Sequence, residues 1–147
     1  MQNVLIDRSY SCKVADFGLS REMHDSGLAT ASTGTPHWVA PEVLAGQKYT
    51  EKIDIYSYAV VLWEMLTMER PFAGMNPFNL ISLFLRDPAY RLDIPDYVPD
   101  VWANLIKMCW AVDPSERPSF REVVRYLSEN IPPEGVPMND TLPAQEE

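Results

Sequence analysis

The sequence predicts a mainly α-helical domain that begins with one short β-hairpin. Apolar residues recur at helical spacing in four segments after residue 50, and two short apolar runs near the N-terminus flank a polar turn. The chain has 147 residues, 46% of them hydrophobic, which suits one domain with a real core rather than two domains.

The predicted hairpin pairs residues 4–6 with residues 12–15 across the turn 7–11, so that Asp16 lies at the end of a strand. Residues 20–35 are small, polar and without periodicity, which predicts a long loop. Loops of this length in a compact domain are usually functional or disordered. Residues 36–44 are more apolar again.

Four helices are predicted next. The first is capped by Thr50, runs to about Thr67 and is apolar nearly all round, which is typical of a buried helix. Its early Asp54 is therefore conspicuous. Amphipathic stretches follow at residues 76–85, 99–110 and 119–127, and Ser119 with Glu122 forms the pattern of a capping box.

The chain divides into residues 1–130, the predicted domain, and residues 131–147, a Pro-rich tail predicted to be disordered. The tail has four acidic residues and no Lys or Arg, so it supplies −4 of the net charge of −9. That negative charge gives no support to nucleic-acid binding.

Composition also argues against membrane insertion and against a disulfide scaffold. The longest strongly apolar stretch, residues 58–63, is far short of the ~20 residues of a membrane helix, and no signal peptide is evident. The two cysteines, Cys12 and Cys109, are interpreted as reduced thiols in a cytoplasmic protein.

Asn3 and Asp16 are the first candidates for chemistry. Each lies at the end of a paired strand, so the amide oxygen and the carboxylate can converge on one point. Oxygen ligands are what Mg²⁺ requires, and Gly18 would let the chain turn sharply. Taken alone, the three residues 16–18 favour the simpler interpretation, a strand end followed by a glycine turn.

The surrounding motifs favour the first interpretation. They are Asp-Phe-Gly (16–18), Gly-Thr-Pro (34–36), Ala-Pro-Glu (40–42), Trp-Glu-Met (63–65), Arg-Pro-Phe (70–72), Cys-Trp (109–110), Asp-Pro (113–114) and Arg-Pro (117–118). In this order the chain resembles the protein-kinase family from Asn3 to about Asn130. Asn3 resembles the last residue of the catalytic loop H-R-D-L-x-x-x-N, and the first and third motifs resemble D-F-G and A-P-E.

The resemblance implies a fold and a role for each matched residue. The fold would be the C-terminal helical lobe of a kinase, with the N-terminal lobe absent. Asp16 and Asn3 would each hold one Mg²⁺ at the phosphates of ATP, and Phe17 would pack inward. Glu42 would form a buried ion pair with Arg117. Asp54 would accept backbone N–H groups from the catalytic loop, where the helix dipole favours a carboxylate.

The resemblance also indicates the kind of kinase. Gly34-Thr35 resembles serine/threonine kinases, in which this Thr contacts the catalytic Asp, whereas residues 62–65 and 109–110 resemble tyrosine kinases. The mixture is typical of the tyrosine-kinase-like group, whose members mostly phosphorylate Ser or Thr of a protein substrate. The candidate phosphosites of the polar loop are Ser26, Thr30, Ser32 and Thr33.

Several parts of the family pattern are not matched: the glycine-rich loop, the phosphate-binding Lys, the catalytic Asp and the core helix before the catalytic loop. We therefore expect this chain to be inactive alone. We also expect the absence of that core helix to leave apolar surface exposed, through which the chain would associate with other molecules. The sequence leaves two functions open: part of an active serine/threonine kinase, or a truncated lobe that acts as a non-catalytic binding module.

Overall fold

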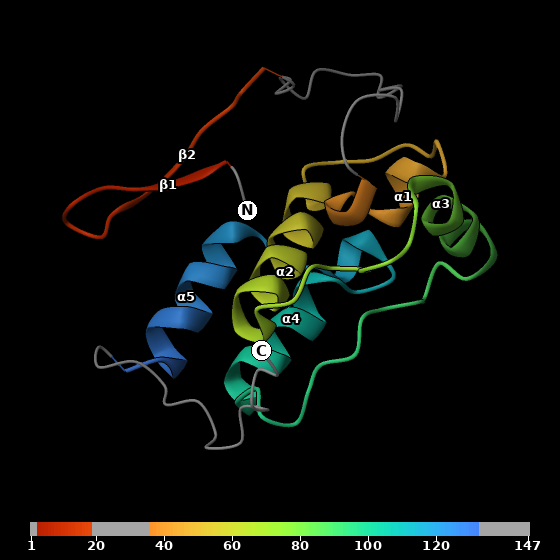
Figure 1. The fold of residues 1–147 in the computed structure, drawn as a ribbon. Coiled ribbons are helices and arrows are strands. Elements are labelled where there is room, and N and C mark those ends of the chain that lie inside the picture. The colour runs from red at the N-terminus through yellow and green to blue at the C-terminus, as the bar shows by residue number, and fades with distance from the viewer. Residues whose placement is uncertain (1–2, 19–35, 133–147) are drawn as a thin grey trace.

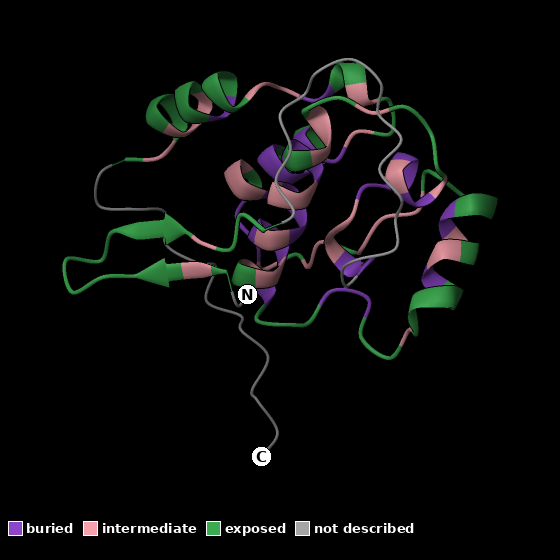
Figure 2. Ribbon diagram, turned by 90° about the horizontal axis from the view of Figure 1, so that it is seen from above, coloured by how far each residue is buried: buried purple, intermediate pink, exposed green. Residues whose placement is uncertain are grey.

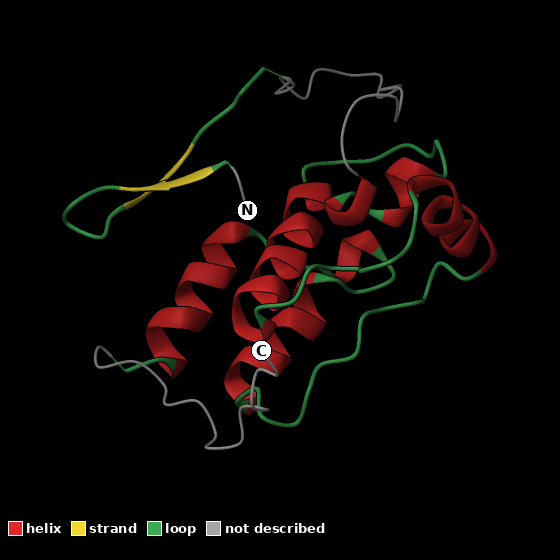
Figure 3. Ribbon diagram, in the orientation of Figure 1, coloured by secondary structure: helices red, strands yellow, loops and turns green. Residues whose placement is uncertain are grey.

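The computed structural model describes residues 3–18 and 36–132, and within them a two-stranded hairpin precedes a helical body (Figures 1 and 3). The elements are β1 (Val4–Ile6), β2 (Cys12–Val14), the 3-10 helix η1 (Pro36–Trp38), α1 (Pro41–Leu44), α2 (Lys52–Thr67), α3 (Pro77–Arg86), α4 (Asp100–Cys109), the 3-10 helix η2 (Pro114–Glu116) and α5 (Phe120–Asn130). The mainly helical prediction is confirmed, while the predicted tail from residue 133 onward lies outside the described residues.

The hairpin forms where the sequence predicted it. β1 and β2 are antiparallel, with Leu5 opposite Lys13. The turn is organised by the Asp7 carboxylate, whose Oδ1 accepts hydrogen bonds from Ser9 N (2.9 Å), Ser9 Oγ (2.6 Å) and Ser11 N (3.0 Å). These bonds, above all that from the Ser9 hydroxyl, lower the pKa of Asp7. Both strands are largely exposed and project from the helices (Figure 2).

α2 is the central helix, and it differs from its prediction in one respect. Its residues Ile55, Ala59 and Val60 are buried, but Met65 is 52% exposed. The helix therefore packs through part of its circumference, although its sequence is apolar nearly all round. No described segment covers the Met65 side, which is why the expectation of a fully buried helix is wrong here.

The caps of the other helices follow the sequence closely. Asn76 Oδ1 accepts a hydrogen bond from Asn79 N at 2.9 Å at the start of α3. Ser119 and Glu122 form the predicted capping box of α5. At α2 the cap position is Glu51 rather than the predicted Thr50, although Thr50 Oγ1 still accepts from Lys52 N at 3.4 Å.

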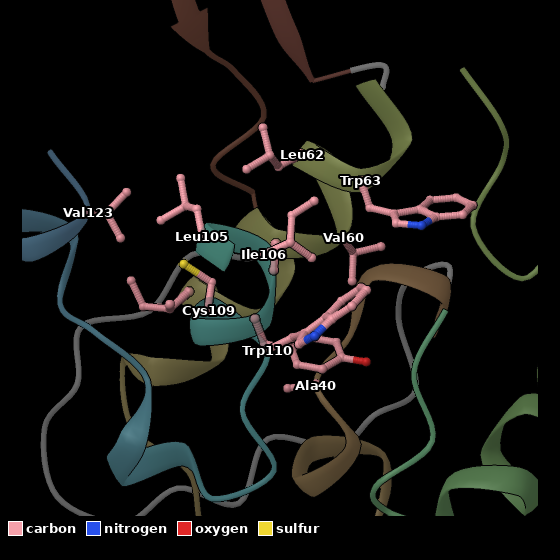
Figure 4. Close-up of a cluster of buried hydrophobic side chains, with 12 residues drawn as sticks. Ala40, Val60, Leu62, Trp63, Leu105, Ile106, Cys109, Trp110 and Val123 are labelled. Atoms are coloured by element: carbon pink, nitrogen blue, oxygen red, sulfur yellow. The ribbon is translucent and has the colours of Figure 1, made fainter. Parts of the chain in front are cut away.

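The main core lies between α2 and α4, with contributions from residue 40 and from α5 (Figure 4). Its buried members are Ala40, Ile55, Tyr56, Ala59, Val60, Leu62, Trp63, Leu105, Ile106, Cys109, Trp110 and Val123. Burial raises the pKa of the Cys109 thiol to about 12, so this cysteine is a packing residue and not a nucleophile.

A smaller core holds α3 against α1. Leu44, Phe72, Leu80 and Phe84 are its buried members, and the Phe72 and Phe84 rings meet edge to face at 5.6 Å. This second cluster fixes α3 beside η1 and α1. Within the described residues no helix is long and apolar enough to cross a membrane.

Candidate functional site

The hairpin brings Asn3 and Asp16 together. Ala15 N donates to Asn3 O at 2.9 Å, which continues the strand pairing up to the two residues. Asn3 Nδ2 then lies 3.4 Å from Asp16 Oδ2, a long and exposed contact. The two side chains therefore lie close together, but the Asn3 amide presents its nitrogen to Asp16 and not the oxygen expected of a metal ligand.

The chain turns at Asp16 itself, not at the glycine. Asp16 has φ = +64°, a left-handed conformation that Asp tolerates better than most residues and that often occurs at functional sites. Gly18 is not among the residues of positive φ, and a Cβ there would meet only Asp16 Oδ1, at an ordinary 3.5 Å. The expectation that Gly18 provides the sharp turn is thus wrong for this structure.

Phe17 also departs from its expected position. The resemblance implied a side chain packed inward, yet Phe17 is 67% exposed. Phe17 follows β2, and the hairpin stands apart from the helical body in Figure 1.

The donor set of Asn3 and Asp16 fits Mg²⁺ chemically. An amide oxygen and a carboxylate are hard ligands, and Mg²⁺ commonly takes one or two protein carboxylates and keeps several waters. In residues 3–18 and 36–132 no three His, Cys, Asp or Glu side chains gather as a metal site. Water and phosphate oxygens would therefore have to complete the coordination of an ion held here.

Asp54 lies in the first turn of α2, as predicted. The residue is exposed in this structure. Partial burial nevertheless desolvates the carboxyl group and raises its pKa. Its role as an acceptor for catalytic-loop N–H groups stays a prediction.

Glu42 and Arg117 form a buried, bidentate ion pair, the geometry that the resemblance implied. Arg117 Nη1 lies 2.6 Å from Glu42 Oε1, and Arg117 Nη2 lies 3.0 Å from Glu42 Oε2. Arg117 is 1% exposed and Glu42 8%. Arg117 further donates to Lys52 O at 3.1 Å and to Ala111 O at 3.0 Å, so one side chain joins α1, α2 and the segment after α4.

Sequence reasoning missed Tyr56 and Arg91, which extend this network. The Arg117 and Arg91 guanidinium groups both lie over the Tyr56 ring, at 5.2 and 5.4 Å from its centroid. Arg91 also donates to Trp110 O at 2.7 Å. Burial raises the pKa of Tyr56 to about 12 and lowers the pKa of Arg91. No local motif marks Arg91, because its partners are backbone carbonyls and the ring of Tyr56, which is far from it in the sequence.

The remaining candidates cannot be placed. Thr35 and the candidate phosphosites Ser26, Thr30, Ser32 and Thr33 lie outside the described residues. η1 at Pro36 is the first element that follows them.

The comparison with protein families agrees with the motifs and the helical fold. Residues 1–127 match the family model described as protein tyrosine and serine/threonine kinase. Because this match covers most of the sequence, the chain belongs to that family.

Individual relatives carry serine/threonine kinase names. The chain is 42% identical to the probable serine/threonine-protein kinase SIS8 of Arabidopsis thaliana over 99% of its residues. It is 47% identical to the probable serine/threonine-protein kinase drkD of Dictyostelium discoideum and 42% identical to drkC of the same organism, each over 85% of its residues. It spans 15%, 10% and 17% of the lengths of these three relatives.

Proposed function

We propose that this chain forms the helical part of a tyrosine-kinase-like serine/threonine kinase, which transfers the γ-phosphoryl group of ATP to a Ser or Thr hydroxyl of a protein. The observation that carries the proposal is the convergence of Asn3 and Asp16 at the hairpin end, within a matched family sequence. The two free cysteines favour a cytoplasmic protein.

Each proposed residue has a distinct task. Asp16 and Asn3 would hold divalent ions, and Mg²⁺ bound there would supply charge neutralisation at the transferring phosphates. Glu42 and Arg117 hold the A-P-E segment onto the helical body. The family resemblance assigns Thr35 to a contact with the catalytic Asp and Asp54 to support of the loop that carries it.

The direct test is a phosphotransfer assay with Mg-ATP and protein acceptors. A complete kinase domain that contains this sequence is expected to label Ser or Thr of the acceptor. The 147-residue chain alone is expected to transfer no phosphate to the acceptor. Its matched motifs include neither the glycine-rich loop and Lys that bind the phosphates nor the catalytic Asp. Labelling by the chain alone, abolished by Asp16→Ala, would contradict the proposed incompleteness.

The alternative, a non-catalytic binding module, rests on the exposed apolar side chains of the helices. Met65 of α2 and Val124 of α5 are 52% and 64% exposed. A module of this kind would bind a protein partner through these residues, and a complete domain that labels no acceptor would favour it.

Thr35→Ala is expected to lower kcat in the complete domain about 10- to 100-fold, whereas Thr33→Ala leaves it nearly unchanged. Thr35 directly precedes η1 and is the residue that the resemblance places on the catalytic Asp. Steady-state kinetics on an acceptor peptide measures both variants. Equal losses would contradict the serine/threonine assignment.

A further inference from the structure

A groove lies between α4 and the loop that follows α3. The loop runs beside the helices from the end of α3 to the start of α4 (Figure 1). Its residues 91–96 and 98 line the groove together with α4 and Trp110, around a volume of about 410 Å³. This volume is in the range of about 300–1,000 Å³ that is typical of ligand sites.

The groove has an apolar part that is fixed to the main core. Val98 and Trp110 are buried, and Ile94 is partly buried against that core. Trp63 Nε1 donates a hydrogen bond to Asp93 O at 2.7 Å, which ties the loop to α2. The apolar lining is therefore held in place by the fold itself.

The rim of the groove carries three exposed carboxylates, those of Asp93, Asp96 and Asp100. Within the described part of the chain none of them forms an ion pair or a side-chain hydrogen bond. Asp100 lies in the first turn of α4, where the helix dipole already favours a carboxylate. Asp93 and Asp96 lie on the loop and have no such role.

Two cations line the same groove, and they do not neutralise the rim. The Arg91 guanidinium is turned inward, because Nε donates to Trp110 O at 2.7 Å, Nη1 donates to Pro88 O at 2.8 Å and Nη2 is buried. Lys107 of α4 is exposed. Even with both cations counted, the three carboxylates leave an excess of negative charge.

We propose that this groove binds a polypeptide segment in which basic side chains alternate with apolar ones. The apolar side chains lie against Ile94 and Trp110, and the basic ones pair with Asp93 and Asp96. Alternation suits an extended segment, because its successive side chains point to opposite sides. The amide N–H groups of Leu92, Asp93 and Ile94 make no hydrogen bond among the described residues, so the loop backbone can pair with such a segment.

Charge favours this partner over other occupants. The net charge of −9 opposes association with a second copy of the chain, with nucleic acid or with an anionic membrane. The candidate metal ligands Asn3 and Asp16 lie on the hairpin, and the groove contains no residue of the D-F-G or A-P-E motifs. The inference therefore goes beyond the proposed phosphotransfer and does not depend on it.

The test measures binding of fluorescent peptides to the complete kinase domain by fluorescence anisotropy. The probe is the peptide Leu-Arg-Leu-Arg-Leu-Gly, and two matched peptides carry Glu in place of Arg or Ser in place of Leu. Asp93→Asn with Asp96→Asn removes both loop charges at constant shape, and Lys107→Gln removes the exposed ammonium group. Glu51→Gln with Glu129→Gln is the control, which removes two exposed carboxylates outside the groove.

The variants are expected to shift affinity in opposite directions. Asp93→Asn with Asp96→Asn should raise the Kd of the Leu-Arg peptide roughly 3- to 10-fold, the loss of two exposed ion pairs. Lys107→Gln should lower this Kd about 2-fold, because it removes a repelling charge. Added salt should weaken binding to the unmodified domain, and the control pair should bind as the unmodified domain does.

Other outcomes overturn the inference. Equal affinity for the Glu peptide would refute recognition by charge, and equal affinity for the Ser peptide would refute the apolar contact. No binding of the Leu-Arg peptide, or undiminished binding in Asp93→Asn with Asp96→Asn, would show that the groove is not its site. A dimer of the unmodified domain in analytical ultracentrifugation that Ile94→Ser dissociates would assign the groove to a second copy instead.

Discussion

Replacing either partner of the Glu42–Arg117 ion pair is expected to destabilise the kinase domain by about 3–5 kcal/mol. Both side chains are almost fully buried and bonded through two N–H···O contacts, so each satisfies the charge of the other. Removing one leaves an uncompensated charge in a dry environment. Loss of Arg117 also removes the hydrogen bonds that its side chain donates to the backbone carbonyls of Lys52 and Ala111.

A double-mutant cycle measures the coupling in this pair. Glu42→Gln, Arg117→Met and the double variant are compared by urea unfolding in the complete domain. The cost of the double variant should be well below the sum of the single costs. Glu129→Gln and Arg125→Met, both on the exposed side of α5, provide a cycle in which we expect small effects. Additive costs for Glu42 and Arg117 would mean that the pair contributes no coupling.

Asp16→Ala is expected to lower kcat of the complete domain at least about 100-fold, with the fold intact. Even partners outside the first coordination shell of a metal typically affect affinity or activity 10- to 100-fold, so loss of a direct carboxylate ligand should cost no less. Asn3→Ala should have a similar but smaller effect, because an amide oxygen contributes no formal charge. Steady-state kinetics over a Mg²⁺ titration measures both.

The hairpin offers a matched control for these variants. Lys13 lies on exposed β2 and pairs with Leu5, so Lys13→Ala changes the same hairpin away from the proposed ligands. This variant should keep its activity and its Mg²⁺ dependence. Unchanged turnover in Asp16→Ala at saturating Mg²⁺ would refute the assignment of Asp16 as a metal ligand.

Most of the helical fold could be predicted from the sequence. The capping box of Ser119 and Glu122 and the cap at Asn76 depend on residues within four positions of one another, so local spacing suffices to find them. The turn at Asp7 is local in the same way. The convergence of Asn3 and Asp16 follows from the pairing of two adjacent strands, which the apolar pattern also indicated.

The expectations that failed concern surfaces that depend on neighbours. Phe17 and the Met65 face of α2 are apolar by sequence, but burial requires another segment to cover them, and among the described residues none does. The position of the turn at Asp16 rather than at Gly18 also escaped prediction. Backbone dihedrals at a strand end are set by the next contacts of the chain and not by residue type alone.

By itself the sequence determined the family, the order of the helices, the caps at Asn76 and Ser119 and the candidate metal ligands, because these depend on motifs and on short-range periodicity. Only the tertiary structure decided that Arg117 is enclosed by three segments, that Arg91 lies over Tyr56 and that Trp38 is held by Ser57 and Glu64. These contacts join residues 19 to 75 positions apart, apart from the local bond from Arg117 to Ala111. Because their geometry is fixed when α2 and α4 pack around a common core, no local pattern in the chain specifies them.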